Sequence, residues 1–301
     1  MYYRSLNEEL REKFGEKLYK LALDGGFTCP NRDGTIGSRG CTFCLGGSGS
    51  FAEGQCASVT EQIERAKRRV EKKNPSGKYI AYFQSYTNTY APTERLAALF
   101  GEAIAHPDVA ALSVGTRPDC LPPEVIDLLS RLNKIKPVWV ELGLQTIHEQ
   151  TAEKIRRGYP LLVFDEAVKN CKAAGLYTVV HMIIGLPGET PEMAAQTAAY
   201  VGKSGADGIK LQLLHVLRGT DIAEEYAAGE FQAMSMEEYI AALEECVRRL
   251  PPQMTVHRLT GDGDKRYLVA PLWSADKKRV LNAVNAAFRR DNVVQGEHYE
   301  V

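Results

Sequence analysis

The stretch LYKLALDGGFTCPNRDGTIGSRGCTFC, residues 18–44, joins a short apolar run to a glycine-rich loop that carries three cysteines. Residues 18–23 have the length and apolar content of a buried β-strand. In the loop, eleven residues separate Cys29 from Cys41 and two separate Cys41 from Cys44. The glycines permit backbone conformations with positive φ, which let the chain wrap closely around a small site. The stretch therefore predicts a metal site directly after the first strand.

The number of clustered thiols distinguishes two kinds of metal site. A structural zinc site normally has four protein ligands, whereas a [4Fe–4S] cluster held by three cysteines leaves one iron open to a substrate or cofactor. We therefore expect Cys29, Cys41 and Cys44 to hold a [4Fe–4S] cluster. The alternative is zinc, with Cys56 or a distant histidine as the fourth ligand. In a reducing compartment, clustered thiols indicate a metal before disulfides.

Outward from this loop, short apolar runs alternate with amphipathic segments. Six strand–helix alternations predict a parallel sheet with helices on its outer face, either doubly wound or a partial barrel. Ligands of such sheets gather at the carboxyl ends of the strands. The expected strands are 18–23, 79–83, 110–114, 138–144, 177–184 and 208–213, and the helices between them 60–73, 93–105, 123–132, 164–174 and 192–204.

The last part of the chain follows a break at Pro251–Pro252, after a helical stretch over 235–250. Two consecutive prolines end a helix because neither has a backbone N–H to donate. We expect a core domain over 1–250 and a small C-terminal extension over 251–301, with one helix near 274–290. The extension would cap the barrel or contact the substrate.

Composition is that of an ordinary soluble protein. Of 301 residues, 44% are hydrophobic and 25% are charged, which fits one large domain. The net charge of −1 excludes the broad basic surface of proteins that bind nucleic-acid backbones, so such a partner would need a local patch. The chain has no secretory segment and no run of about 18 apolar residues. We expect a cytoplasmic protein without a membrane partner.

The cysteine loop resembles that of the radical S-adenosylmethionine (radical SAM) superfamily. This superfamily usually has three and then two residues between its cysteines, with an aromatic residue before the last one, a position held here by Phe43. The longer first interval is similar to that of the YhcC/YtqA-like subfamily, which is related to the elongator catalytic subunit and to oxygen-independent coproporphyrinogen oxidase. Further segments that resemble motifs of this branch are YFQSYTNTYAP (82–92), VELGLQT (140–146), KIRRGY (154–159), HMIIGLPGET (181–190) and KLQLLHVLRGT (210–220).

The resemblance implies an α/β fold, a partial (β/α)6 TIM-like barrel. It also implies that the cluster and S-adenosylmethionine are cofactors, which together generate a 5′-deoxyadenosyl radical, and that a donor such as flavodoxin or ferredoxin reduces the cluster. The implied cofactor contacts are Phe43, Gly185 and Gly188 beside the adenine, Gln84, Ser85 and Thr87 at the ammonium group, Glu141 and Gln145 at the ribose or methionyl group, and Arg157 at the carboxylate.

Each of these contacts has a structural alternative. Glu141 would pair with an arginine inside the sheet, and Gln145 would cap the following helix. Arg157 would be a solvated cation at a helix end. Gly185 and Gly188 would form a plain strand-to-helix turn.

Three further side chains are candidates for the substrate pocket. Cys120 follows the third strand, His181 lies in the fifth and His215 follows the sixth. The alternative for Cys120 is core packing, and for each histidine a hydrogen-bonded core position. Cys171 and Cys246 fall on helix faces, where we expect them in the core.

The subfamily resemblance implies transfer RNA as the substrate, with remodelling of a wobble-uridine side chain from the carboxymethylaminomethyl toward the aminomethyl form. Basic residues cluster within 65–73 and 258–290, where Tyr267 and Trp273 are available to stack on bases. The alternative for these clusters is a solvated surface of mixed charge. Two other functions stay open, a radical SAM enzyme for a small molecule such as a tetrapyrrole, and a non-catalytic metal-binding regulator. No feature of the sequence indicates a particular oligomeric state.

Overall fold

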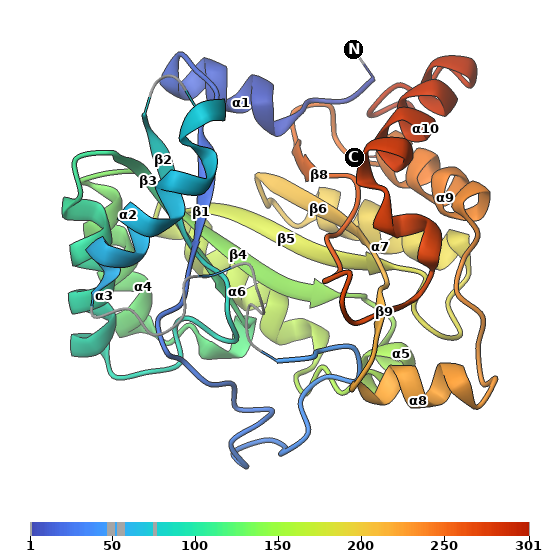
Figure 1. The fold of residues 1–301 in the computed structure, drawn as a ribbon, viewed down its shortest axis with the longest axis horizontal. Helices are drawn as coiled ribbons and strands as arrows, with labels where there is room; N and C mark the ends of the chain where they lie inside the picture. Colours follow the sequence, from blue (N-terminus) through green and yellow to red (C-terminus); the bar gives the residue numbers. More distant parts are fainter. Residues whose placement is uncertain (1, 47–51, 53–57, 75–76, 301) are drawn as a thin grey trace.

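The computed structural model describes residues 2–46, 52, 58–74 and 77–300. Its main sheet contains seven parallel strands whose order in space follows their order in sequence. Each crossover therefore places its helix on the same side, and the sheet curls into a partial barrel (Figure 1). This confirms the expected fold and excludes the doubly wound alternative. The strands are β1 (Tyr19–Leu23), β2 (Tyr79–Phe83), β3 (Val109–Thr116), β4 (Val138–Gln145), β5 (Tyr177–Ile184), β6 (Gly208–Leu213) and β8 (Thr255–Arg258).

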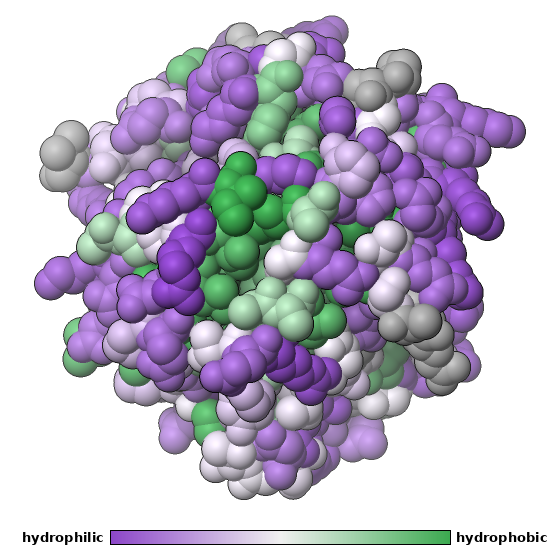
Figure 2. All heavy atoms as spheres, turned by 90° about the vertical axis from the view of Figure 1, so that its left-hand side faces the viewer, coloured by the Kyte–Doolittle hydropathy of each residue, from purple (hydrophilic) through white to green (hydrophobic). Residues whose placement is uncertain are grey.

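Helices cover the convex side of the sheet, and their apolar faces form one core with the strands. Their bounds agree with the expected segments to within a few residues. The outer surface over α2, α3 and α4 is mostly hydrophilic, with a hydrophobic hollow near its centre (Figure 2). The helices between consecutive strands are α2 (Val59–Val70), α3 (Thr93–Ala105), α4 (Pro123–Asn133), α5 (Glu149–Lys154), α6 (Leu161–Ala173) and α7 (Pro191–Lys203), with 3-10 turns at Glu71–Lys73 and Pro118–Cys120.

The C-terminal part is joined to the barrel. Strand β8 lies in the segment expected as an extension, yet it pairs with β6 and forms the last strand of the main sheet. A separate antiparallel pair is formed by β7 and β9. The remaining elements are β7 (Val216–Leu217), α8 (Asp221–Ala227), α9 (Met236–Arg248), β9 (Leu268–Ala270), a 3-10 turn (Leu272–Ala275) and α10 (Lys277–Arg290). None of the helices in the described part of the chain is both long and apolar enough to cross a membrane.

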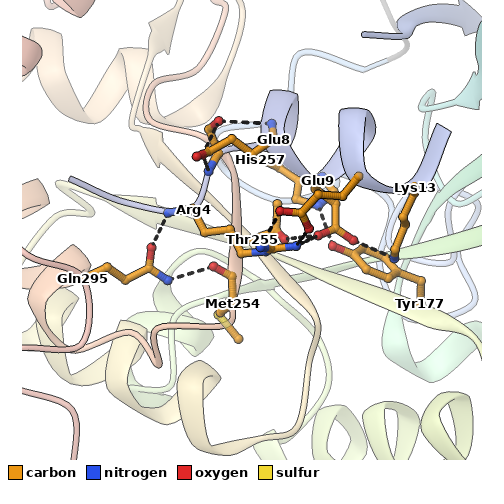
Figure 3. Close-up of polar contacts among 11 residues, drawn as sticks. Arg4, Glu8, Glu9, Lys13, Tyr177, Met254, Thr255, His257 and Gln295 are labelled. Atoms are coloured by element: carbon orange, nitrogen blue, oxygen red, sulfur yellow. Dashed lines mark hydrogen bonds and ion pairs between the residues drawn. The ribbon is translucent and has the colours of Figure 1, made fainter. Parts of the chain in front are cut away.

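The N-terminal segment closes the amino end of the barrel (Figure 3). Helix α1 (Leu6–Phe14) begins at a capping box, in which Ser5 and Glu8 satisfy each other's backbone N–H groups. Just before it, the carbonyl of Arg4 accepts a hydrogen bond from Val256 of β8 at 2.8 Å. Gln295 accepts from the Arg4 N–H at 2.8 Å and donates to the carbonyl of Met254 at 2.8 Å. The two ends of the chain are thus held against the start of β8.

Candidate active site

The cysteine loop lies beyond the carboxyl ends of the strands, on the side of α5 and α8 (Figure 1). The N–H of Arg32 donates to the carbonyl of Cys29 at 2.8 Å, and that of Cys44 to the carbonyl of Cys41 at 3.0 Å, so each cysteine lies in a tight turn. Asn31 is buried, and its amide donates to Cys41 Sγ at 3.6 Å. All three cysteines are free thiols, and they line one cavity of about 190 Å³, which we call the cysteine cavity.

The spacing of the three sulfurs fits a cluster better than a single ion. One zinc ion with Zn–S bonds of about 2.3 Å holds its sulfurs roughly 3.8 Å apart. Among the described residues, the one trio of metal-binding side chains with all ligand atoms within 4.8 Å is Glu64, His106 and Asp108. Lys67 already bridges the two carboxylates of that trio. At least one pair of the three cysteine sulfurs therefore lies more than 4.8 Å apart, farther than the sulfurs around one zinc ion. Cys56, the proposed fourth zinc ligand, lies outside the described residues.

Charge around the thiols also suits a cluster of thiolates. Burial, together with the neighbouring Cys44, raises the pKa of Cys41 to about 11. Arg117 opposes this rise, and Arg117 and Arg32 both line the cavity. Metal binding displaces the thiol protons, and the two guanidinium groups would offset the negative charge that results. Sequence reasoning missed both arginines, although Arg117 stands in the GTRPDC segment beside Cys120.

Most of the predicted cofactor residues meet at this cavity. Three of the side chains come from β4 and β5, and the others come from the cysteine loop and from the segments that follow β2 and α5. Those that line it with the cysteines are Phe43, Gln84, Thr87, Glu141, Gln145, Arg157 and His181.

The other predicted residues lie elsewhere. Ser85 is buried beside the cavity without lining it. Gly185 faces Met234, whose sulfur would lie 2.9 Å from an added Cβ, and Gly188 faces open space. Both have φ of +88°, so the turn interpretation accounts for them.

Cys120 and His215 border two further cavities. Cys120 lines a cavity of about 660 Å³ on the outer side of the cysteine loop, together with Pro30 and Tyr90. His215 lines one of about 270 Å³ that shares Phe43, Gln145 and His181 with the cysteine cavity. Burial lowers the pKa of His215 to about 4, so its imidazole is neutral at pH 7. Cys171 and Cys246 are fully buried, which confirms their core positions.

Gln145 has the features of a ligand-binding residue. Its backbone is left-handed, with φ of +69°, a conformation that glutamine rarely adopts. Its Oε1 atom is buried without a hydrogen-bond partner, in a residue that lines the cysteine cavity. It does not cap the next helix, since the N-cap residue of α5 is His148 and no side chain makes a capping hydrogen bond there. A strained residue with an unsatisfied acceptor at a cavity indicates a ligand contact.

Arg157 is buried and not solvated, so the alternative of a solvated helix-end cation is wrong. Its guanidinium donates to the carbonyls of Thr146 at 2.6 Å and Tyr159 at 3.0 Å, and to the Glu149 carboxylate at 3.0 Å. These bonds fix the guanidinium at the wall of the cavity. Its contact with a cofactor carboxylate stays a prediction.

Every strand of the sheet contributes one polar side chain to a single layer inside the barrel. The register pairs Tyr82 with Ser113, His181 with Lys210 and Lys210 with Arg258 directly, whereas the members from the other neighbouring strands are two positions apart and so point to the same face. In strand order they are Lys20, Tyr82, Ser113, Glu141, His181, Lys210 and Arg258.

Glu141 is the centre of this layer. Its Oε1 accepts from Lys20 and from Ser113 at 2.6 Å, and its Oε2 accepts from Lys210 and from His181 at 2.7 Å. With four donors the carboxylate is saturated, which favours ion pairing over cofactor contact, although the partners are lysines and not the arginine considered above. Burial would raise the pKa of Glu141, but Lys20 and Lys210 hold it well below its usual range.

The same burial acts on the cations. It lowers the pKa of Lys210 to about 7, against the opposing effect of Glu141. Burial, with Lys210 nearby, also lowers the pKa of His181 to about 4. At pH 7 the layer thus contains an ionised Glu141, a neutral His181 and a Lys210 close to its titration point.

Comparison with known proteins identifies the family. The model of the Radical SAM superfamily matches residues 33–201, more than half of the chain, and that of the Radical_SAM C-terminal domain matches residues 206–290. The uncharacterized protein YtqA of Bacillus subtilis is 43% identical over 99% of this chain and 93% of its own length. Protein YhcC of Escherichia coli is 38% identical over 89% of this chain and 86% of its own length.

More distant matches share the fold or part of the chain. The archaeal Methanocaldococcus infernus Elp3 superposes with a TM-score of 0.71 at 19% identity, over 92% of this chain and 64% of that one. The tRNA uridine(34) acetyltransferase of Methanocaldococcus jannaschii is 27% identical over 50% of this chain and 28% of its own length. Cys29, Cys41 and Cys44 lie at the carboxyl end of a partial barrel, and both family models match the chain. This chain therefore belongs to the radical SAM superfamily and is an enzyme that uses a [4Fe–4S] cluster and S-adenosylmethionine.

Proposed function

We propose that this enzyme modifies transfer RNA by remodelling the side chain of a wobble uridine, from the carboxymethylaminomethyl to the aminomethyl form. The observation that carries the proposal is the relationship to an enzyme of uridine 34, together with the likeness of the fold to Elp3. One relative is named as a tRNA uridine(34) acetyltransferase, and the partial barrel superposes on archaeal Elp3 over 92% of the chain. When bound, the cluster and S-adenosylmethionine supply a radical that removes a hydrogen atom from the substrate.

The residues of the cysteine cavity have defined parts in this proposal. Cys29, Cys41 and Cys44 hold the cluster, and Gln145 offers its free amide oxygen to the cofactor. Phe43 lines both the cysteine cavity and the neighbouring cavity of His215, so it lies where cofactor and substrate would meet. The buried walls exclude water, which protects a radical from side reactions.

Several residues of the two basic clusters have carboxylate partners. On α2, Arg65 pairs with Glu61 at 2.5 Å, and Lys67 pairs with Asp108 at 2.6 Å. In the C-terminal part, Arg266 pairs with Asp264 at 2.6 Å. Lys277 and Arg290 have carboxylate partners as well. These pairs fit the surface of mixed charge for part of the two clusters, while Arg69 and Arg258 line a cavity that is described below.

The test compares the modified nucleosides of transfer RNA from cells with and without the gene. We expect the carboxymethylaminomethyl uridine to accumulate and the aminomethyl form to disappear when the gene is deleted. An unchanged profile would overturn the transfer RNA proposal and favour a small-molecule substrate. Reconstituted enzyme that cleaves S-adenosylmethionine to 5′-deoxyadenosine under anaerobic conditions would dispose of the non-catalytic regulator.

A further inference from the structure

A second cavity enters the barrel between its two edge strands. This side cavity, of about 350 Å³, is bordered by β1 and β8, by the start of α1 and by one face of α2. It shares Tyr82 and Gln84 with the cysteine cavity, so the two cavities meet inside the barrel. A group that enters from the side therefore comes to rest next to the cofactor.

The walls of the side cavity carry more positive than negative charge. The cationic residues that line it are Lys20, Arg69, Lys210 and Arg258, and the carboxylate that lines it is Asp262. Asp262 is also bound to Lys277, at 2.7 Å, and lies 3.3 Å from Arg258. The negative charge of Asp262 is therefore already balanced by Lys277 and Arg258.

Lys20 and Lys210 share a single carboxylate. Both pair with Glu141, and burial leaves their side chains only 19% and 5% exposed. The Tyr82 ring lies 4.6 Å from the Lys20 ammonium and 4.7 Å from that of Lys210, and its hydroxyl is 3.2 Å from the Lys210 nitrogen. An aromatic face stabilises a cation only in part. When both ammonium groups are protonated, two buried cations face one carboxylate, and the excess positive charge at the cavity wall is costly without an anion.

His257 adds a polar group without a partner to the same cavity. Its Nδ1 atom is buried and makes no hydrogen bond, while its Nε2 is 3.3 Å from the Tyr177 hydroxyl. When Tyr177 donates to Nε2, Nδ1 carries the ring proton and is a donor without an acceptor.

We propose that the side cavity binds an anionic group of the substrate, a carboxylate or a phosphate, between Lys20, Lys210 and Arg258. The inference rests on the proposed function for the class of substrate. Two sources of the anion are then available, the carboxylate of the carboxymethylaminomethyl side chain and a phosphate of the RNA. In both, the excess charge holds the substrate at the junction of the side cavity and the cysteine cavity.

The first test uses small anions, so that it does not depend on RNA. Acetate and inorganic phosphate are titrated calorimetrically into the cluster-loaded enzyme, the Lys210→Met variant and a Lys172→Met control. Lys172 pairs with Asp207 on the surface, away from the side cavity. We expect at least one anion to bind the unaltered enzyme and the control, and its affinity to fall about tenfold or more in Lys210→Met. Lys210→Met should fold, because Glu141 keeps Lys20 as its partner.

The second test identifies the source of the anion. Anticodon stem–loop RNAs with carboxymethylaminomethyl uridine or plain uridine at position 34 are bound to the same three proteins. If the source is the side-chain carboxylate, the unaltered enzyme prefers the modified RNA and Lys210→Met loses that preference. If it is a phosphate, Lys210→Met weakens both RNAs equally and lowers the salt dependence of binding.

The outcomes separate this inference from the proposed function. Equal anion affinity in Lys210→Met and Lys172→Met, or no binding of either anion, would overturn the anion site even if the nucleoside profile changes. Binding of a small anion without binding of either RNA would leave the site standing and remove transfer RNA as the substrate.

Discussion

The amino end of the barrel and its interior layer use the same residue types in different ratios. At the amino end, Glu9 pairs with Arg4 and Lys13, both at 2.6 Å (Figure 3), and Arg4 pairs also with Glu12. Two cations thus face two carboxylates. The Arg4 and Lys13 side chains are 30% and 43% exposed, so water screens any remaining imbalance.

In the interior layer Lys20 and Lys210 face Glu141. The side chains of all three are less exposed to water than those of Arg4 and Lys13. Desolvation makes an unmatched charge expensive there, whereas a matched surface pair is nearly neutral. A protein that only needed a stable barrel would have one lysine or an apolar pair at these positions. The comparison teaches that the amino end is built for stability and that the interior layer is kept for a ligand.

The largest effect should come from removing the central carboxylates of the two regions. Glu141→Gln leaves two buried ammonium groups without a counter-charge, and we expect the free energy of unfolding to fall by about 3 kcal/mol or more. Glu9→Gln leaves Arg4 with Glu12 and Lys13 with water, and should cost about 1 kcal/mol or less. Urea unfolding at pH 7 measures both. Equal losses would mean that the two charge networks do not differ as described.

A rise in pH should have a smaller effect. It should increase the stability of the fold and weaken the binding of the anion. The pKa of Lys210 is lowered from 10.5 to about 7, so protonated Lys210 destabilises the folded state, fully below pH 7 and less as pH rises toward 10.5. Stability should therefore increase over this window. The affinity for acetate should fall over the same window, by up to about tenfold per pH unit, because the bound anion needs the charged lysine.

The pH trends of stability and of anion binding can be assigned to Lys210 by measurement, because most of its neighbours do not change their charge over the same window. His181 and His257 are neutral above pH 6 and Tyr82 is neutral throughout, since burial lowers the pKa of both histidines and raises that of the tyrosine. Glu141 stays ionised, and Arg258, from the paired strand, keeps its charge. Lys20 titrates in the same direction as Lys210, since its pKa is also lowered by burial. In Lys210→Met both pH trends should therefore shrink, and unchanged trends would assign them to another group.

The sequence predicted best what depends on nearby residues. Strands β2 to β6 are buried on both faces and appear as apolar runs, and the cysteine spacing is a local pattern. Strand β8 was not predicted because its four residues, TVHR, closely follow two prolines and include three polar or charged side chains. Helix α1 was not predicted either. Its bounds are nevertheless signalled in the sequence, at the start by Ser5 and Glu8 at capping-box spacing and at the end by Gly15.

The polar layer inside the barrel could not be predicted from the sequence in this way. Lys20 and Glu141 are 121 positions apart, and Glu141 and Lys210 are 69 apart, so their meeting depends on the register of the strands. A lysine within an apolar strand, as in YKLAL and GIKLQL, is the one local signal. Tyr82, within an apolar strand, lines both cavities, because the barrel interior at this level is hollow.

The smallest expected effect sharpens the comparison at a single residue. Gln145 holds a left-handed backbone conformation and its side chain lies over Gly143, where an added Cβ would meet Gln145 Nε2 at 2.9 Å. Gln145→Gly should relieve the backbone strain and stabilise the fold by about 0.5–1 kcal/mol, while it weakens S-adenosylmethionine binding about tenfold through loss of the amide acceptor. Thermal unfolding of the cluster-loaded enzyme and equilibrium binding of S-adenosylmethionine measure the two quantities.

Asn292→Gly is the matched control for this variant. Asn292 also has a positive φ, of 48°, but it follows α10 and lines neither the cysteine cavity nor the side cavity. It should gain similar stability with unchanged cofactor affinity, because only the backbone strain is removed. If Gln145→Gly also kept full affinity, its strain would be a structural accident of the bulge between β4 and β5. A gain in stability together with a loss of affinity at Gln145 alone would show that this residue, like the two lysines, is kept for a ligand at the expense of the fold.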